Sequence, residues 1–130
     1  MRIGHIILNV KDFTSSEPVY DSFMSALGFE CDYCETTDEW AAKSYRCGEH
    51  NLWIKWDKTH SHEEFVRDIG LDHLSFFVET REKVNDLFLV IENLELIITR
   101  PPRDYPEYDK NYYAFYFRDP DGIPLEIYCK

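Results

Sequence analysis

Residues 71–78 (LDHLSFFV) and the residues 80–91 (TREKVNDLFLVI) that follow them decide the fold class of this chain. The first run is short and rich in aromatic and aliphatic residues, which is typical of a strand. In the second run the apolar residues recur at helical spacing, and Thr80 is placed to cap the helix N-terminus. Further strands are predicted at about 95–99, 112–118 and 124–129, with a long loop at 100–111. This half of the chain therefore has the order βαβββ.

The first half of the chain has the same order of elements. Residues 3–10 (IGHIILNV) form a predicted strand. A helix is expected to start near the side-chain oxygens of residues 14–16 and to end before Gly28. Strands then follow at about 29–37, 41–47 and 51–56.

The two halves also share a register. His5 and His73 are 73 − 5 = 68 positions apart, and at the same offset Tyr20 falls on Phe88 and Phe23 on Ile91. A register shared by strand and helix indicates a duplication. The sequence predicts an α+β fold of two βαβββ modules in tandem, over about residues 1–57 and 70–130, within one domain spanning 1–130.

Composition and charge restrict the class of partner. Hydrophobic residues make up 44% of the 130 residues, and this is enough for a packed core. The 25 acidic and 14 basic residues give a net charge of −11, which disfavours nucleic acid and anionic membrane surfaces as partners. No apolar run reaches the ~18 residues of a membrane span, and the N-terminus lacks the pattern of a signal peptide. We expect a cytoplasmic protein that binds a small molecule, with no nucleic-acid or membrane partner.

The four cysteines stand at positions 31, 34, 47 and 129. Cys31 and Cys34 form a C-x-x-C motif inside an alternating, strand-like run. Residues three apart on a regular strand point to opposite faces, so the two thiols are not expected to share a partner. We expect unpaired structural thiols, as in a reducing compartment.

Strand alternation places three metal-ligating residue types on the mixed faces of the predicted strands. These are His5, its repeat equivalent His73, and Glu126 on the last strand. Two histidines and a carboxylate can bind a divalent ion and leave positions open for water or substrate. A strand histidine on its own is more often a packed or surface residue, so spacing alone leaves both interpretations open.

Four stretches of this sequence resemble the vicinal oxygen chelate superfamily, which includes glyoxalase I, bleomycin-resistance proteins, fosfomycin-resistance enzymes and extradiol dioxygenases. They are residues 4–12 (GHIILNVKD), 26–29 (ALGF), 71–76 (LDHLSF) and 117–126 (FRDPDGIPLE). The resemblance covers essentially the whole chain, and the Asp-Pro-Asp-Gly turn leading into Leu-Glu is its most specific part. Residues 100–108 and 112–114 resemble single-domain, glyoxalase-like members without an assigned substrate.

The resemblance implies a curved mixed sheet around a cup, completed in a homodimer. It also implies a divalent ion, which is Zn, Ni, Mn, Fe or Co, held by His5, His73 and Glu126, with Glu126 as the catalytic base. Two positions depart from known branches. Trp53 stands where glyoxalase I has a fourth ligand, and Ile7 stands where glutathione-transferring fosfomycin-resistance enzymes have a threonine.

Five residues are candidates for substrate binding. Trp53 and Tyr128 would form apolar walls, Lys55 would meet a carboxylate or phosphate, and Tyr108 and Tyr113 would cover the pocket from the long loop. Ordinary packing, a solvated surface charge and loop anchoring are the respective alternatives.

Three functions fit this pattern. The preferred one is a metal-dependent lyase or isomerase acting on a substrate that is chelated through vicinal oxygens. The second is a fosfomycin-resistance-like transferase or hydrolase, and the third is a bleomycin-resistance-like protein that binds a ligand without chemistry. The retained His5, His73 and Glu126 argue against the third.

Overall fold

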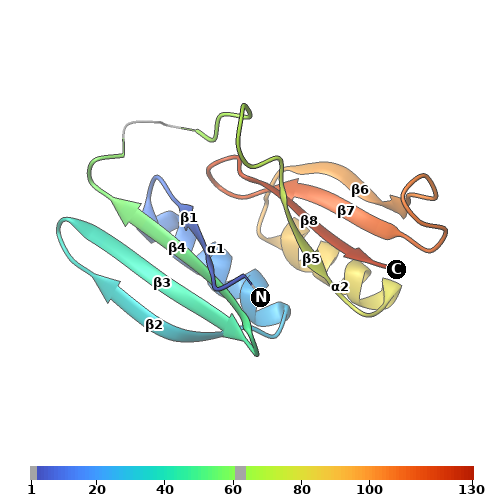
Figure 1. Ribbon diagram of the computed structural model, residues 1–130, viewed down its shortest axis with the longest axis horizontal. Coiled ribbons are helices and arrows are strands. Elements are labelled where there is room, and N and C mark those ends of the chain that lie inside the picture. The colour runs from blue at the N-terminus through green and yellow to red at the C-terminus, as the bar shows by residue number, and fades with distance from the viewer. Residues whose placement is uncertain (1–2, 61–63) are drawn as a thin grey trace. The chain divides into compact units, whose positions relative to one another are not determined.

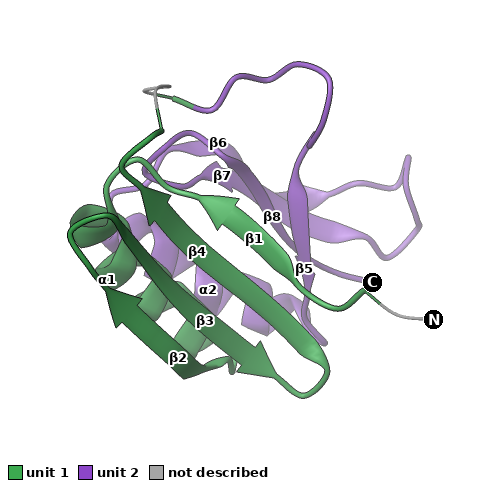
Figure 2. Cartoon of the chain, turned by 60° about the vertical axis from the view of Figure 1, so that its left-hand side comes forward, with its two compact units in different colours: residues 1–64 green, residues 65–130 purple. Residues whose placement is uncertain are grey.

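The computed structural model describes residues 3–60 and 64–130 of the chain. The chain forms two compact units, Met1–Glu64 and Phe65–Lys130, shown in separate colours in Figure 2. Each unit has one helix on one face of a four-stranded mixed sheet, as Figure 1 shows. The predicted α+β fold of two βαβββ modules is confirmed. Among the described residues, no helix has both the length and the apolar character needed to cross a membrane.

The first unit has the strand order β1-β4-β3-β2, with β1 parallel to β4 and the other pairs antiparallel. Its elements are β1 (Ile6–Asn9), α1 (Phe13–Ala26), β2 (Glu30–Thr36), β3 (Trp40–Cys47) and β4 (His50–Asp57). Tyr20, Phe23 and Met24 of α1 are fully buried, as is Ile54 of β4. The apolar stripe of the helix therefore covers the alternate apolar residues of the strands.

The start of α1 differs from the prediction. Its N-cap is Asp12, whose Oδ1 accepts a hydrogen bond from the Thr14 backbone N–H at 3.0 Å. The expected cap within residues 14–16 is wrong, because a carboxylate two residues earlier satisfies the free N–H groups of the first turn. The end of the helix is as predicted, since Gly28 follows it with a φ of 86°.

The second unit has the equivalent order β5-β8-β7-β6, with β5 parallel to β8. Its elements are β5 (Leu74–Phe77), α2 (Arg81–Asn93), β6 (Ile98–Asp104), β7 (Tyr113–Arg118) and β8 (Pro124–Cys129). Thr80 caps α2 as predicted, accepting a hydrogen bond from the Lys83 backbone N–H at 3.1 Å. Leu87, Ile91, Leu125 and Ile127 are fully buried and form the core on this side of the sheet.

Strand β6 lies further along the chain than expected. The prediction was a strand at 95–99 and a loop from residue 100, but the strand runs from Ile98 to Asp104. Pro101 and Pro102 are compatible with it because β6 is an edge strand, where a missing N–H breaks no ladder. Register shifts between Ile98 and Arg103 also interrupt the pairing with β7.

The β7–β8 turn sets the register of the last two strands. Asp119 is 4% exposed, and its Oδ1 accepts hydrogen bonds from the backbone N–H groups of Asp121 at 2.9 Å and Ile123 at 2.8 Å. Gly122 has a φ of 86°, a conformation that glycine adopts without steric cost. The resulting register places Tyr116 of β7 opposite Glu126 of β8.

A bulge in β2 overturns the expectation for Cys31 and Cys34. Cys31 is opposite Tyr45 and Tyr33 is opposite Ser44, so Asp32 is one extra residue in the strand. The extra residue shifts the alternation, and Cys34 is opposite Lys43, two positions from Tyr45. The two thiols therefore lie on the same face of the sheet, not on opposite faces.

Candidate metal centre

Glu126 is a buried carboxylate in the middle of the second sheet. It lies on β8 between Ser75 of β5 and Tyr116 of β7, on the face opposite α2, and is only 2% exposed. Burying a charged group is costly unless it is paired and hydrogen-bonded. The partners of this carboxylate therefore indicate what the site is built to hold.

The side chains of His73, Tyr112 and Tyr116 contact the carboxylate. The Tyr112 hydroxyl donates to Oε1 at 2.8 Å, and His73 Nε2 lies 3.0 Å from Oε2. Burial, followed by hydrogen bonding to Glu126, raises the pKa of both Tyr112 and Tyr116 above the ordinary value. Both phenols therefore keep their protons and remain hydrogen-bond donors to Glu126 at neutral pH.

His73 is oriented from its other nitrogen. Nδ1 lies 2.6 Å from Asp72 Oδ2, and Arg67 Nη2 donates to Asp72 Oδ1 at 2.6 Å. Hydrogen bonds from His73 and then from Arg67 lower the pKa of Asp72, so it is an acceptor at neutral pH. Asp72 thus faces Nδ1 as a hydrogen-bond acceptor, and Glu126 faces Nε2. This is the arrangement in which an outer carboxylate orients a metal-binding histidine.

The two facing atoms fit a divalent cation. An imidazole nitrogen and a carboxylate oxygen 3.0 Å apart both present lone pairs, so their approach is favourable only with a shared proton or cation. Within residues 3–60 and 64–130, no three His, Cys, Asp or Glu side chains are grouped to hold a metal. Asp72 faces the other side of the ring, so His73 and Glu126 are the two side chains of ligand type that face one another here.

Aromatic side chains border the carboxylate. Tyr112 stacks on Tyr128 with ring centroids 4.7 Å apart, and Phe77 contacts Tyr128 edge to face at 5.5 Å. Tyr108 is 59% exposed and stacks on the buried Tyr105 at 5.5 Å. Two of the predicted substrate-binding residues, Tyr108 and Tyr128, therefore belong to the aromatic cluster that includes Tyr112.

Three predicted residues lie in the first unit. His5 is exposed and immediately precedes β1. Trp53 and Lys55 lie on the same face of β4, opposite the buried Ile54. Trp53 Nε1 donates to Asn51 at 2.6 Å, and Lys55 Nζ lies 3.7 Å from Asp57.

Tyr113 lies away from the candidate centre. It is paired with Cys129, which is three positions from Glu126 and therefore on the other face of β8, and its hydroxyl donates to Asn85 of α2 at 2.9 Å. Arg81 of α2 also lies over its ring at 4.6 Å. Tyr113 therefore packs on the helix side of the sheet, and we leave it out of the proposed substrate site.

Sequence reasoning missed Asp72, Tyr112 and Tyr116. Pairing outward from the Asp-Pro-Asp-Gly turn would have placed Tyr116 opposite Glu126. Asp72 directly precedes His73, and its carboxylate could have been considered as an orienting partner. Tyr112 begins the predicted strand at 112–118 and immediately precedes β7 in the structure, and alternation in the predicted strand puts it on the same face as Tyr116.

Known structures share this fold along the whole chain. A glyoxylase/bleomycin resistance protein/dioxygenase domain from Frankia sp. EAN1pec is 23% identical with a TM-score of 0.81, covering 99% of this chain and 97% of the other. A glyoxalase family protein from Enterococcus faecalis is 21% identical with a TM-score of 0.70, covering 98% and 96%.

A genomically encoded fosfomycin resistance protein from Listeria monocytogenes also has this fold. Its mutant, solved in complex with Mn(II) and 1S,2S-dihydroxypropylphosphonic acid, is 18% identical with a TM-score of 0.70, covering 97% of this chain and 87% of the other. None of the curated proteins matches the chain significantly. The profile of one protein family matches residues 2–127. With that match and the fold described above, the chain belongs to the Glyoxalase/Bleomycin resistance protein/Dioxygenase superfamily.

Proposed function

We propose that this protein is a small metal-dependent lyase or isomerase whose substrate is chelated through two neighbouring oxygens. The observation that carries the proposal is the buried Glu126 carboxylate, with His73 Nε2 at 3.0 Å and the Tyr112 hydroxyl at 2.8 Å. Superfamily membership and the Mn(II) bound in the crystal structure of a structural relative support it. The carboxylate and the imidazole supply two of the metal ligands, and His5, the repeat equivalent of His73, supplies the third.

The ion, when bound, supplies Lewis acidity to the substrate oxygens. Glu126 is proposed as the base that removes a proton from the carbon beside them. Tyr112 steadies Oε1 of that carboxylate, and Asp72 holds the imidazole of His73 in the ligating tautomer. Trp53 stands in place of a second carboxylate, so the proposed proton transfer uses one base.

Four further side chains are proposed to bind the substrate. Trp53 and Tyr128 are proposed as apolar walls for the substrate and Tyr108 as a cover, and Lys55 is proposed to meet a carboxylate or phosphate. A homodimer and a cytoplasmic location are proposed on the resemblance to superfamily members.

Deuterium exchange tests the base directly. The protein is loaded separately with Zn²⁺, Ni²⁺, Mn²⁺, Fe²⁺ or Co²⁺ and mixed in D₂O with small 2-hydroxyketones and with hemithioacetals of 2-ketoaldehydes. We expect proton NMR to show exchange at the carbon next to the carbonyl, and expect Glu126→Gln to abolish it. Tyr113→Phe, on the helix side of the sheet, is the matched control and should exchange normally. Exchange that survives Glu126→Gln would contradict the assignment of the base.

A second candidate function is the opening of an epoxide that carries a phosphonate. Arg100 is exposed, is paired with Tyr116, and lies over its ring at 5.3 Å, so it places a cation near Glu126. Phosphorus NMR with an epoxypropylphosphonate separates the candidates. A new diol or thiol-adduct signal that is lost in Arg100→Gln supports epoxide opening. Binding of either substrate class without any conversion would indicate a ligand-binding protein.

A further inference from the structure

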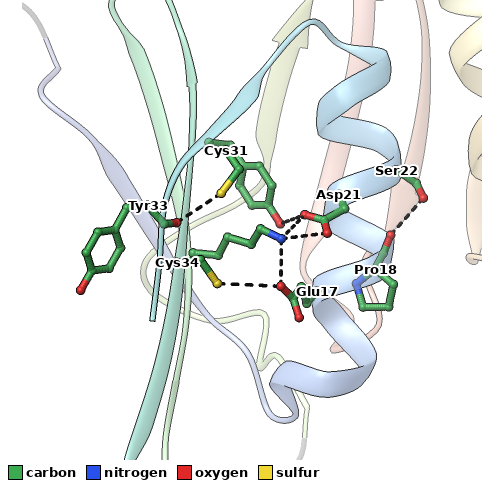
Figure 3. A network of polar contacts seen from close by, with 9 residues as sticks. Glu17, Pro18, Asp21, Ser22, Cys31, Tyr33 and Cys34 are labelled. Carbon is green, nitrogen blue, oxygen red and sulfur yellow. Dashed lines mark hydrogen bonds and ion pairs between the residues drawn. The ribbon is translucent and has the colours of Figure 1, made fainter. Parts of the chain in front are cut away.

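The first unit carries a pair of thiols on one face of its edge strand. The bulge at Asp32 puts Cys31 opposite Tyr45 and Cys34 opposite Lys43. Lys43 Nζ contacts Glu17 and Asp21 of α1, and the Tyr45 hydroxyl donates to Asp21 at 2.8 Å, so this is the face toward the helix. Figure 3 shows both sulfur atoms on the side of β2 that faces α1.

Both thiols are accessible although they face the helix. Cys31 and Cys34 are exposed and free, because β2 is the edge strand of its sheet. Cys34 Sγ lies 3.9 Å from Glu17 Oε1, and Cys31 Sγ makes a 3.5 Å contact with the Tyr33 carbonyl. Cys129 is buried. Cys47 is half-buried at the end of β3 nearest Cys31, two positions beyond Tyr45 and therefore on the same face of the sheet.

The spacing favours a bridging atom over a disulfide. Residues opposite Cys31 and Cys34 are two positions apart on β3, a separation of about 6.6 Å along a strand. Disulfides require Cα atoms within about 6.8 Å and Cβ atoms about 3.8 Å apart, and same-face neighbours on one strand do not meet the second condition. An atom with two bonds of about 2.3 Å to sulfur, the length of a zinc–thiolate bond, bridges a wider gap.

The charges around Cys31 and Cys34 favour a ligand that adds no net charge when both sulfur atoms bind it. Glu17 and Asp21 carry two negative charges beside the single positive charge of Lys43. Burial, followed by the charge of Glu17, raises the pKa of Cys34, while Lys43 acts in the opposite direction. A ligand that replaces two S–H bonds without adding charge avoids this repulsion.

We propose that Cys31 and Cys34 form a bidentate site for trivalent arsenicals carrying one organic group. The reaction is a condensation, in which two thiols and one arsenic–oxygen group form two arsenic–sulfur bonds. The two thiol protons leave with the oxygen as one water, and arsenic stays trivalent. No oxidant or reductant is needed.

Phenylarsine oxide is the probe for this site. We expect intact-mass spectrometry to show one phenylarsenic group on the wild type that persists in excess 2-mercaptoethanol and is removed by 1,2-ethanedithiol. The test is made in a Cys47→Ser background, which removes the other thiol on this face near Cys31. There, Cys34→Ser should lose the adduct in excess 2-mercaptoethanol, with retention at least about a hundredfold weaker, because it loses the intramolecular second bond.

A relocated thiol gives the matched control. Glu35 is paired with Ala42 and therefore points to the face opposite Cys31. The double variant Cys34→Ser/Glu35→Cys keeps the number of thiols on β2 but separates them, and it should behave like Cys34→Ser. Alkylation by iodoacetamide checks that the thiols remain accessible, and circular dichroism checks the fold. Equal loss of arsenic from the wild type and from the double variant would overturn the proposal.

Discussion

At the scale of single residues, Lys43 shows how a partly buried charge is held. Its side chain is 12% exposed, and Nζ lies 2.8 Å from the carboxylates of both Glu17 and Asp21. Burial alone would lower the pKa of this lysine, but the hydrogen bonds that it donates to Asp21 and Glu17 outweigh this effect and raise the pKa above the ordinary value. Lys43 therefore stays charged and links α1 to the sheet.

Removing this charge should destabilise the first unit. Lys43→Met keeps the aliphatic stem but leaves two neighbouring carboxylates without a cation, and we expect a loss of about 1–3 kcal/mol in the free energy of unfolding. Because the folded pKa is raised, the stabilisation is complete below the ordinary lysine pKa of about 10.4 and is lost as the pH rises through the folded value. Urea unfolding at pH 7 measures the loss.

Lys55→Met is the control for this prediction. Lys55 is 41% exposed, and its Nζ lies 3.7 Å from one carboxylate, so its removal should change stability by less than about 0.5 kcal/mol. Equal effects of the two substitutions would contradict a structural role for Lys43.

Cys34 should react slowly with alkylating agents at neutral pH. Its raised pKa, caused first by burial and then by Glu17 and opposed by Lys43, keeps most of the thiol protonated. The midpoint of its alkylation rate should lie above the usual thiol value of about 8.5, and Glu17→Gln should move it down. Cys31 and Asp21 remain as neighbouring titratable groups in this variant. Peptide mapping after iodoacetamide treatment at several pH values measures the midpoint. Glu35→Gln, on the opposite face, should leave it unchanged, and an unshifted midpoint in Glu17→Gln would refute the role of that carboxylate.

At the scale of elements, the β7–β8 turn positions the candidate metal centre. The hydrogen bonds from two backbone N–H groups to Asp119 fix the hairpin, and the hairpin register puts Tyr116 beside Glu126. Any change in this turn is therefore transmitted to the pairing of the last two strands.

Asp119→Ala tests the turn. It leaves buried N–H groups without their acceptor, so we expect the free energy of unfolding to fall by about 1–3 kcal/mol. Asp119→Asn retains an acceptor oxygen and should lose less. Chemical denaturation compares the three proteins. Identical stability of Asp119→Ala and the wild type would show that the turn is held by other contacts.

At the scale of the whole molecule, residue spacing predicted the order of elements and the tandem repeat. The apolar residues of α1 and α2 and the 68-residue offset carry that information in the sequence itself. The joint position of His73 and Glu126 followed from strand alternation and is consistent with their 3.0 Å contact.

Features that depend on one inserted or displaced residue were not predictable in this way. The extra Asp32 reversed the expected faces of Cys31 and Cys34, because alternation assumes an unbroken strand. Tyr113 lies in the predicted strand at 112–118, as the structure has it, but it faces α2 and not the pocket that it was expected to cover. In a strand, a shift of one residue decides the face on which a side chain lies.

The central claim is that His73 and Glu126 hold a divalent ion. The most direct measurement is the metal content, by inductively coupled plasma mass spectrometry, of protein purified without affinity tag or chelator and then dialysed against Zn²⁺, Ni²⁺ or Mn²⁺. We predict about one ion per chain in the wild type and in Tyr113→Phe, and loss of the ion in His73→Ala, Glu126→Gln and His5→Ala. Wild-type protein that stays empty with every ion, or His73→Ala and Glu126→Gln variants that keep it, would contradict the claim.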